Sequence, residues 1–401
     1  MTTAIGFLND QILVRGPDGR LGTDEAFVRF LLAFGRYFDR VVLISRVAPG
    51  RAASAPALSL DRPGVEVVEL PFYPRIGSLL ITPWRWWPAI DRALESIQQL
   101  DALWLNTGHP ISMRAMTKLG DRARPQLIAA LRGNYETDAS MRHGSGGLMR
   151  RAATWAQTGT MRRFARQAQA RDVPVLAYGR QAVARARELG MRAYDFETTL
   201  IDEATLRAPP AADPGLDVDL VTVCRLVHEK GLDRLLDAMP DIVGPDGRPA
   251  TLAIVGDGPL RADLEARIDR LGLRNRVRMD GMVAHGPALL TRLRSARAFV
   301  LPSRTEGVPA SVIESMSMQV PVVASAVGGL PDLCGEGRGI LVDPSGDDAA
   351  FAARFGAACS ALLRDAHLAS DTARSAFARV HELTIERQIE RAVAILRNET
   401  R

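Results

Sequence analysis

Two glutamates with a defined spacing are the residues of this sequence best suited to binding a ligand. Glu306 and Glu314 stand eight residues apart in the stretch LPSRTEGVPASVIESMSMQVPVVAS, residues 301–325. Glu306 is expected in a loop after a buried strand, and Glu314 just over one turn into a helix that begins after Pro309. Carboxylates accept hydrogen bonds from hydroxyl groups and repel phosphate, whereas a helix N-terminus attracts anions. Hydroxyl groups and phosphate bound side by side indicate a nucleotide sugar.

A second pair of residues supplies positive charge. Arg225 and Lys230 lie in the loop CRLVHEKG, residues 224–231, which follows the predicted strand Val218–Val223 and precedes an amphipathic helix. Two cations at a helix start can clamp a diphosphate and stabilise the charge that grows on a leaving group. Arginine is the usual basic residue of this chain, and Lys230 is one of its two lysines. We therefore favour a functional role for Lys230 over an ordinary surface position.

These segments together resemble a known family. The stretch EGVPASVIESM, followed by PVVASAVGGLPDL, resembles the donor-site signature of retaining glycosyltransferases of family 4, which have the GT-B fold. The loop with Arg225 and Lys230 resembles the Gly-Arg-Leu…Lys-Gly loop of that family, with Cys224 in the glycine position. The resemblance is close over residues 218–345 and weaker over residues 1–200.

The resemblance implies roles for individual residues of the second half. Glu306 would face the donor sugar, and Glu314 would hold the ribose hydroxyls of the nucleotide. Arg225 and Lys230 would act on the diphosphate, so that we expect these two cations and Glu306 to be the catalytic residues. The donor-binding residues would include Gly307, Val308 and Glu314, and His285 could face the base.

Three positions in the first half are weaker candidates. Gly22 matches a family glycine that lets the backbone approach the donor diphosphate, although an ordinary turn explains it equally well. Arg132 stands where many family members have a histidine near the transferred sugar. A fixed cation there could contact the sugar, the diphosphate or an anionic acceptor. His109 follows a predicted strand on its carboxyl side and is an acceptor-side candidate, although a lone histidine is more often structural.

The first half alternates strands and helices. Its apolar runs of strand length are Ala4–Leu8, Val41–Ser45, Val65–Leu70, Ala102–Asn106, Leu127–Leu131 and Val173–Tyr178. Such alternation predicts a parallel, doubly wound sheet, which binds ligands beyond the carboxyl ends of its strands. With the resemblance, the expected fold class is α/β of the GT-B type, with two Rossmann-like domains facing a central cleft.

The expected domain organisation follows from composition and from the family. Residues 1–206 would form an acceptor-binding domain, and residues 207–217, rich in proline and alanine, a linker. Residues 218–380 would form the nucleotide-sugar-binding domain. Residues 381–401 contain an amphipathic helix that, by resemblance, would cross back to the first domain.

Composition narrows the class of protein. The chain has 401 residues, of which 47% are hydrophobic and 24% charged, as in soluble globular proteins with more than one domain. Its basic excess is spread out and lacks the dense runs of a nucleic-acid-binding protein. Three cysteines without metal-ligand spacing favour the cytoplasm. The residues MTTAIGFLND are expected to form a first strand and not a signal peptide, and no apolar run is long enough for a spanning helix.

Residues 73–88 suggest a surface that contacts something else. They hold three of the five tryptophans, Trp84, Trp86 and Trp87, among arginines and prolines. The prolines argue against a continuous helix. Tryptophan with arginine suits a membrane interface, which would place the protein peripherally on the inner face of the cytoplasmic membrane. Packing of the segment onto its own domain is an equally good explanation.

The expected reaction is transfer of a hexose-type sugar, with retention, from a UDP or GDP sugar to an acceptor sugar or a lipid-linked sugar. Its biological setting would be cell-surface polysaccharide or glycolipid assembly. No cofactor and no metal site are expected, since the cations would clamp the diphosphate. The alternatives are a nucleotide-sugar epimerase of the same fold, glycosylation of a soluble small molecule, and a two-domain binding protein without chemistry.

Overall fold

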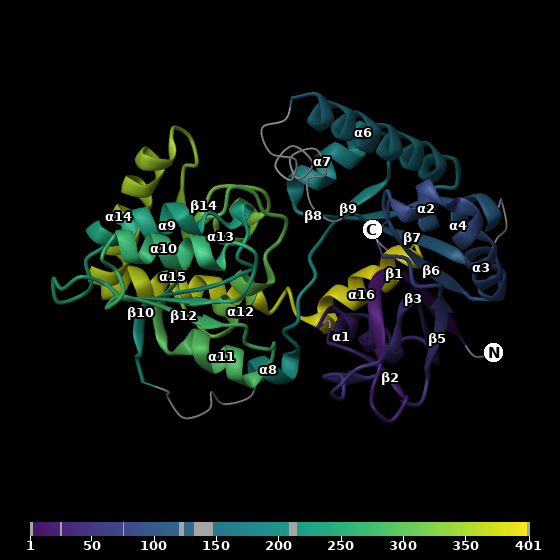
Figure 1. Cartoon of the computed structure of the whole chain (residues 1–401), viewed down its shortest axis with the longest axis horizontal. Helices are drawn as coiled ribbons and strands as arrows, with labels where there is room; N and C mark the ends of the chain where they lie inside the picture. Colours follow the sequence, from purple (N-terminus) through teal and green to yellow (C-terminus); the bar gives the residue numbers. More distant parts are fainter. Residues whose placement is uncertain are drawn as a thin grey trace. The chain divides into compact units, whose positions relative to one another are not determined.

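A computed structural model of the chain describes residues 3–24, 26–74, 76–119, 124–131, 147–207 and 215–398. The chain forms two compact units (Figure 1). Unit 1 contains Met1–Phe196 and Ile385–Arg401, and unit 2 contains Glu197–Thr384. The chain thus leaves unit 1 ten residues before the expected boundary at 206, and most of the expected linker lies outside the described residues.

Within the described residues, unit 1 is built on a sheet of nine strands, of which the central ones are parallel. Its parallel strands run in the order β5-β3-β1-β6-β7-β8-β9. Their bounds are β1 Ala4–Arg15, β3 Arg40–Arg51, β5 Val65–Leu70, β6 Ala102–Asn106, β7 Gln126–Leu131, β8 Val175–Tyr178 and β9 Ala193–Phe196. Two short antiparallel strands, β2 Leu21–Thr23 and β4 Leu58–Ser59, extend the sheet beside the end of β1. The predicted parallel sheet is confirmed.

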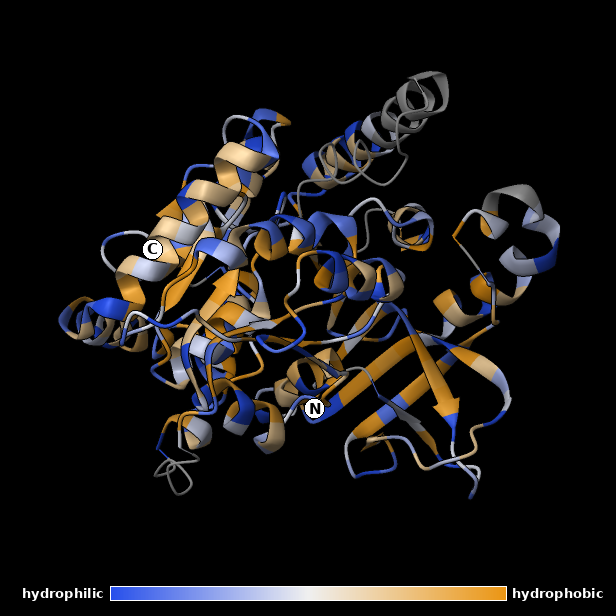
Figure 2. Cartoon of the chain, turned by 60° about the vertical axis from the view of Figure 1, so that its left-hand side comes forward, coloured by the Kyte–Doolittle hydropathy of each residue, from blue (hydrophilic) through white to orange (hydrophobic). Residues whose placement is uncertain are grey.

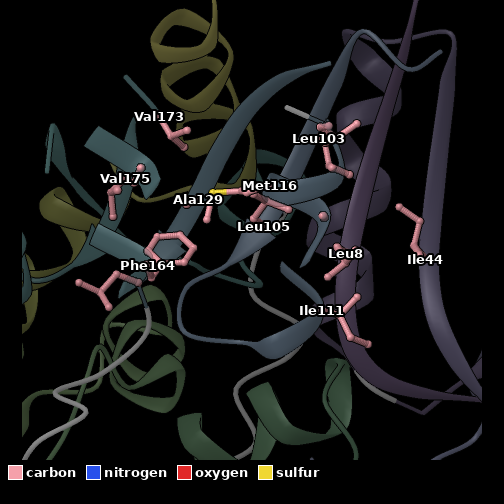
Figure 3. Packing of buried hydrophobic residues seen from close by; sticks show 14 of the residues in the cluster. Leu8, Ile44, Leu103, Leu105, Ile111, Met116, Ala129, Phe164, Val173 and Val175 are labelled. Atoms are coloured by element: carbon pink, nitrogen blue, oxygen red, sulfur yellow. The ribbon is translucent and has the colours of Figure 1, made fainter. Parts of the chain in front are cut away.

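Successive side chains along each strand point to opposite faces of this sheet, and both faces are apolar. On one face, Leu8 of β1 joins a buried cluster with residues of β3 and β6 and with Phe164 (Figure 3). On the other face, Phe7 packs against Phe34 and Trp104, with ring centroids 5.0 and 5.8 Å away. The helices of unit 1 are α1 Phe27–Leu32, η1 Ala33–Arg36, α2 Ser78–Ile81, α3 Pro83–Ser96, α4 Pro110–Leu119, α6 Gly147–Ala170, α7 Arg180–Glu188 and α16 Ile385–Leu396.

Helix α3 corrects the expectation of a loop or a short broken helix at the tryptophans. It runs without a break from Pro83 to Ser96 and contains Pro88. Pro83 occupies the first turn, where its missing N–H costs no hydrogen bond. The indole N–H groups of Trp86 and Trp87 donate to Thr82 Oγ1 and Leu79 O, both at 3.1 Å. Packing of these two indoles into unit 1 therefore outweighs the free-energy cost of Pro88 inside the helix.

The described part of unit 2 contains a parallel sheet of six strands in the order β12-β11-β10-β13-β14-β15. The strands are β10 Val218–Val223, β11 Leu252–Val255, β12 Val277–Gly281, β13 Ala296–Leu301, β14 Val322–Ser325 and β15 Ile340–Val342. The helical segments are α8 Glu203–Arg207, η2 His228–Lys230, α9 Leu232–Ala238, η3 Met239–Asp241, α10 Arg261–Arg270, α11 Pro287–Arg294, α12 Ala310–Ser317, α13 Leu330–Cys334, α14 Asp348–Arg364 and α15 Ala366–Val380.

Helix α16 belongs to unit 1, although it follows unit 2 in the chain. Glu386 forms an ion pair with Arg36 at 2.8 Å, and Asn398 accepts a hydrogen bond from Arg192 at 3.0 Å. Hydropathy colouring shows mainly hydrophobic strands and helices of mixed character (Figure 2). Within the described ranges, none of the helices combines the length and apolar character needed to span a membrane.

Candidate functional site

The two cations predicted to bind phosphate lie after β10, at the carboxyl edge of the unit 2 sheet. Arg225 is exposed and, among the residues that the structure describes, forms no ion pair. Lys230 closes the short helix η2, and Gly231 then adopts a left-handed conformation with φ of +64°. A Cβ atom at Gly231 would lie 2.2 Å from the carbonyl oxygen of Pro302. Only glycine lets this loop approach the loop after β13 so closely.

Lys230 and Glu306 meet directly. Lys230 Nζ lies 2.6 Å from Glu306 Oε1, and the Ser303 hydroxyl donates to the same oxygen at 2.5 Å. The Glu306 side chain is only 5% exposed, so the nearby cation offsets much of the cost of burying its charge. Both contacts fall on Oε1, and Oε2 remains able to accept a hydrogen bond from a ligand. The structure thus brings together two predicted catalytic residues as an ion pair.

A network of two arginines holds the loops after β10 and β13 together. The Arg304 N–H donates to the carbonyl of Glu229 at 2.8 Å, and its guanidinium binds both carboxylate oxygens of Asp233 at 2.7 and 2.8 Å. Burial alone would raise the pKa of Asp233, but the hydrogen bond and charge of Arg304 lower it overall. Buried Arg234 donates to the Pro302 carbonyl at 2.6 Å. No pattern in the sequence indicated this network, because it depends on contacts between distant segments.

Glu314 lies in α12 and is 4% exposed. Its Oε1 is 3.2 Å from Nε2 of His285, in the loop after β12. Glu314 was expected at the ribose and His285 at the base, and the sequence did not predict contact between them. The structure therefore adds an imidazole, 14% exposed, beside the carboxylate assigned to the ribose.

The backbone of Glu306, Gly307 and Val308 rests on a pair of glycines. Gly329 N–H donates to the Gly307 carbonyl at 2.9 Å. A Cβ atom at Gly328 would lie only 1.8 Å from the carbonyl oxygen of Glu306, and Gly328 has φ of +57°. The turn at Gly328 and Gly329 therefore fixes the position of the loop that carries Glu306, Gly307 and Val308.

A similar turn supports Arg225. A Cβ atom at Gly256 would lie 1.9 Å from the Cys224 carbonyl oxygen, and the Leu226 N–H donates to the Asp257 carbonyl at 2.9 Å. Burial raises the pKa of the Cys224 thiol to about 11. The thiol consequently stays uncharged at neutral pH and adds no negative charge beside the cations.

The candidates of the first half have different outcomes. Gly22 lies within strand β2, paired with Val14 and Ser59, and not in the expected turn. A Cβ atom there would lie 2.3 Å from Pro56, so close packing explains this glycine. Arg132 lies outside the described residues.

His109 belongs to a polar cluster that was not predicted from the sequence. Its Nε2 lies 3.4 Å from Asp10 Oδ1, and the same oxygen accepts the Tyr73 hydroxyl at 2.6 Å and lies 3.2 Å from Arg46 Nε. All four residues lie level with the carboxyl ends of β5 and β6, because Arg46 pairs with Leu70 at the end of β5 and Phe7 pairs with Trp104 near the end of β6. The polar pair Asn9-Asp10, directly after an apolar strand, was the signal that could have identified it.

Within the described part of the chain, no group of three or more His, Cys, Asp or Glu side chains is arranged to hold a metal ion. The charged groups of the unit 2 site are instead two cations and two carboxylates. This set can bind an anionic diphosphate and several hydroxyl groups at once.

Comparison with known proteins shows which protein family the second unit is similar to. Residues 217–364 match the family model of the group 1 glycosyl transferases. Alpha-D-kanosaminyltransferase of Streptomyces kanamyceticus is 37% identical over 123 residues, which are 30% of this chain and 31% of the relative. A 2-deoxystreptamine N-acetyl-D-glucosaminyltransferase of Streptomyces fradiae is 32% identical over 171 residues, which are 42% of this chain and 40% of the relative. The chain thus matches less than half of the length of these curated relatives.

Solved structures resemble the whole chain. HepE of Anabaena, in complex with UDP and glucose, has a TM-score of 0.69 at 19% identity and covers 99% of this chain and 100% of its own. Sucrose-phosphate synthase of Thermosynechococcus elongatus has a TM-score of 0.74 at 20% identity, with 99% and 98% covered. WaaG, a glycosyltransferase involved in lipopolysaccharide biosynthesis, has a TM-score of 0.69 at 14% identity, with 98% and 99% covered. The chain therefore has the GT-B fold.

Proposed function

We propose that the chain is a retaining glycosyltransferase that uses a nucleotide diphosphate sugar, because residues 217–364 match the family model of the group 1 glycosyl transferases. The observation that carries the proposal is the contact of Lys230 with Glu306 at the carboxyl edge of a parallel sheet, where the segments after β10 and β13 also carry Arg225 and Glu314. Ligands bind at this edge in open α/β folds. Unit 2 would hold the donor, and unit 1 the acceptor.

The donor would reorganise the ion pair between Lys230 and Glu306. Phosphate oxygens carry negative charge and compete with Glu306 for the Lys230 ammonium. Exposed Arg225 provides a second cation for the same diphosphate. Glu306, partly released from Lys230, then accepts hydrogen bonds from sugar hydroxyls. The cations stabilise the diphosphate most strongly when it leaves, because its negative charge is then greatest.

The chemical step would be a front-face displacement. The bond between the anomeric carbon and the phosphate oxygen breaks, and the acceptor oxygen bonds to the carbon from the same face. The departing phosphate takes the acceptor proton, so that no side chain is required as a general base. The configuration at the anomeric carbon is retained.

UDP-glucose is the donor that we would test first, because HepE was solved with UDP and glucose. The wild-type protein would be incubated with UDP-glucose, UDP-N-acetylglucosamine, UDP-galactose and GDP-mannose, and nucleotide release followed. Release of UDP or GDP by transfer of the sugar to water, with the freed sugar appearing first as the α-anomer by NMR, supports the proposal. Epimerised donor without nucleotide release would identify the epimerase alternative. If all four donors stay unchanged, the hypothesis of a binding protein without chemistry would be favoured.

Membrane attachment is the further part of the proposal and rests mainly on Trp84. Trp84 is 75% exposed and Ile76 is 42% exposed, whereas the indole N–H groups of Trp86 and Trp87 form hydrogen bonds within unit 1. With exposed Arg85, these side chains suit an anionic membrane surface. The acceptor would then be a lipid-linked sugar on the inner face of the cytoplasmic membrane, in polysaccharide or glycolipid assembly.

Co-sedimentation with vesicles of phosphatidylglycerol tests this attachment. Wild-type protein should sediment at low salt, and both added salt and Trp84→Ala should reduce the bound fraction. Met282→Ala is a matched control, because Met282 is 68% exposed but belongs to unit 2. Wild-type protein that stays in the supernatant would favour a soluble small-molecule acceptor.

A further inference from the structure

The polar cluster of unit 1 draws one residue from each of four adjacent strands or from the loop that follows it. Asp10 lies in β1 and Arg46 in β3, while Tyr73 follows β5 and His109 follows β6. These strands are neighbours in the order β5-β3-β1-β6 and run parallel. The register of these strands therefore brings the four side chains together level with the carboxyl ends of β5 and β6.

An irregularity in β1 sets the position of Asp10. Leu8 pairs with Ile44, but Ile12 pairs with Arg46, so that four residues of β1 span the length of two in β3. Asn9 stabilises the extra residues, since its side chain accepts the Gln11 N–H at 3.1 Å and donates to the Gln11 side chain at 2.8 Å. Such bulges disrupt the ladder and redirect side chains, often beside functional sites.

The surroundings of Asp10 hold its carboxylate in place. Tyr73 donates to Oδ1 at 2.6 Å, and Arg46 donates to the Asp10 and Tyr73 carbonyls at 2.8 and 2.6 Å. Burial by itself would raise the pKa of Asp10, but His109, Tyr73 and Arg46 lower it overall, so Asp10 is ionised at neutral pH. Arg46 and Tyr73 are thus positioning residues for a fixed carboxylate.

His109 is the least satisfied member of the cluster. Its side chain is 8% exposed, and its Nδ1 accepts the Ile111 N–H at 3.3 Å. The proton of a neutral imidazole is therefore on Nε2. This Nε2 is buried, lies 3.4 Å from Asp10 Oδ1, and forms no hydrogen bond within the described residues. A buried donor of this kind is costly unless a partner satisfies it.

A purely structural role accounts poorly for this arrangement. A buried ion pair stabilises a fold little compared with apolar packing, and Asp10 keeps 27% of its side chain exposed. One hydroxyl group could donate to the Asp10 carboxylate and accept from His109 Nε2–H. The Arg46 guanidinium, 3.2 Å from Asp10 Oδ1, already supplies the positive charge that a cationic amine would bring, which favours an uncharged ligand.

We propose that Asp10 and His109 bind a hydroxyl group of an uncharged, polyhydroxylated acceptor in unit 1. The inference rests on the proposed function, because it assigns the acceptor of that reaction to this cluster. Asp10 accepts the hydroxyl proton in a hydrogen bond, and His109 donates to the hydroxyl oxygen. The pair therefore selects sugars and cyclitols over aminocyclitols.

Two measurements on the full chain test the assignment independently of turnover. Saturation-transfer NMR would follow binding of methyl α-glucoside, myo-inositol and 2-deoxystreptamine to UDP-loaded protein, and calorimetry would follow UDP affinity. Asp10→Asn should weaken binding of the two uncharged probes at least tenfold, whereas UDP affinity should stay within twofold. His109→Ala should have the same effect, and His109→Gln, which keeps an N–H donor, should restore part of the binding.

Glu66→Gln is the matched control, because Glu66 forms an exposed ion pair with Arg40 elsewhere in unit 1. It should change neither measurement. The proposal is overturned by wild-type protein that binds neither uncharged probe, by Asp10→Asn protein that binds them normally, or by an equal loss of UDP affinity. Failure of the proposed function looks different, since wild-type protein would then release no nucleotide from any donor.

Discussion

The ion pair between Lys230 and Glu306 is the feature on which the residue-scale behaviour of the donor site depends. Because Glu306 is nearly buried, each residue of the pair contributes to the stability of the fold as well as to ligand binding. Arg225 differs, since it is exposed and contacts no carboxylate among the described residues. Variants of the two cations should therefore separate stability from turnover.

Lys230→Ala should lower both the turnover and the stability of unit 2, whereas Arg225→Ala should lower turnover alone. Loss of Lys230 leaves Glu306 with a buried, uncompensated charge, which costs about 3–5 kcal/mol. The double variant Lys230→Ala/Glu306→Gln removes that charge and should regain most of the stability, but no turnover. Thermal unfolding and steady-state kinetics measure the two effects. Equal stabilities of Lys230→Ala and wild-type protein would show that the pair does not contribute to folding.

Glu314→Ala should weaken UDP binding by roughly one to two orders of magnitude, the value of a hydrogen bond to a charged group at about 1.5–3 kcal/mol. Calorimetry with UDP measures this loss. Glu265→Ala, on the surface of α10, is the control and should bind UDP normally. Undiminished affinity of Glu314→Ala would remove Glu314 from the ribose.

At the scale of elements, the sequence predicted the strands well and the contacts between loops poorly. Apolar runs locate parallel strands because both faces of such a sheet are buried. The irregularity at Asp10 escaped prediction because it depends on the register with a neighbouring strand, and α3 because packing of Trp86 outweighs local propensity. The roles of Glu306 and Lys230 stay predictions from resemblance, and their mutual contact was not foreseen.

Gly328→Ala tests the turn that supports the Glu306 loop. The new Cβ would lie 1.8 Å from the Glu306 carbonyl oxygen, so the loop must move and turnover should fall at least tenfold. Gly337→Ala is a close control, because Gly337 also has positive φ, of +78°, but nothing lies within 4 Å of its Cβ position. Both variants should lose about 1–2 kcal/mol of stability from the left-handed conformation. Similar turnover in the two would show that the contact with Glu306 has no catalytic importance.

At the scale of the whole molecule, each unit has its own core, so unfolding should not be a single two-state transition. Asp219 provides a pH-dependent marker for unit 2. It is fully buried and accepts hydrogen bonds from Arg248 at 2.8 and 2.9 Å and from the Thr251 N–H at 2.8 Å. Burial would raise the pKa of Asp219, but these partners lower it below the ordinary value of 3.8.

Because the folded-state pKa is depressed, Asp219 contributes stability above pH 3.8 that is lost as the pH falls through the folded value. Asp219→Asn should therefore destabilise unit 2 at pH 7 by about 1–3 kcal/mol, since it removes a buried hydrogen-bond acceptor, whereas its partner Arg248 is 46% exposed and can be solvated. The difference from wild type should shrink below pH 4. Calorimetric scans at pH 7 and pH 3.5 would measure it, and an undiminished difference at pH 3.5 would contradict the assignment.

The return of α16 to unit 1 has a consequence for synthesis on the ribosome. Domains usually fold in the order in which they emerge, but the last helix of unit 1, Ile385–Leu396, is translated after all of unit 2. The apolar face of α16 holds Ile389, Val393 and Leu396, which are buried in the finished protein. Unit 2 can thus complete its fold while the N-terminal sheet still lacks this cover. During synthesis, the uncovered apolar surface that needs protection would then lie in the N-terminal half of the nascent chain and not in unit 2.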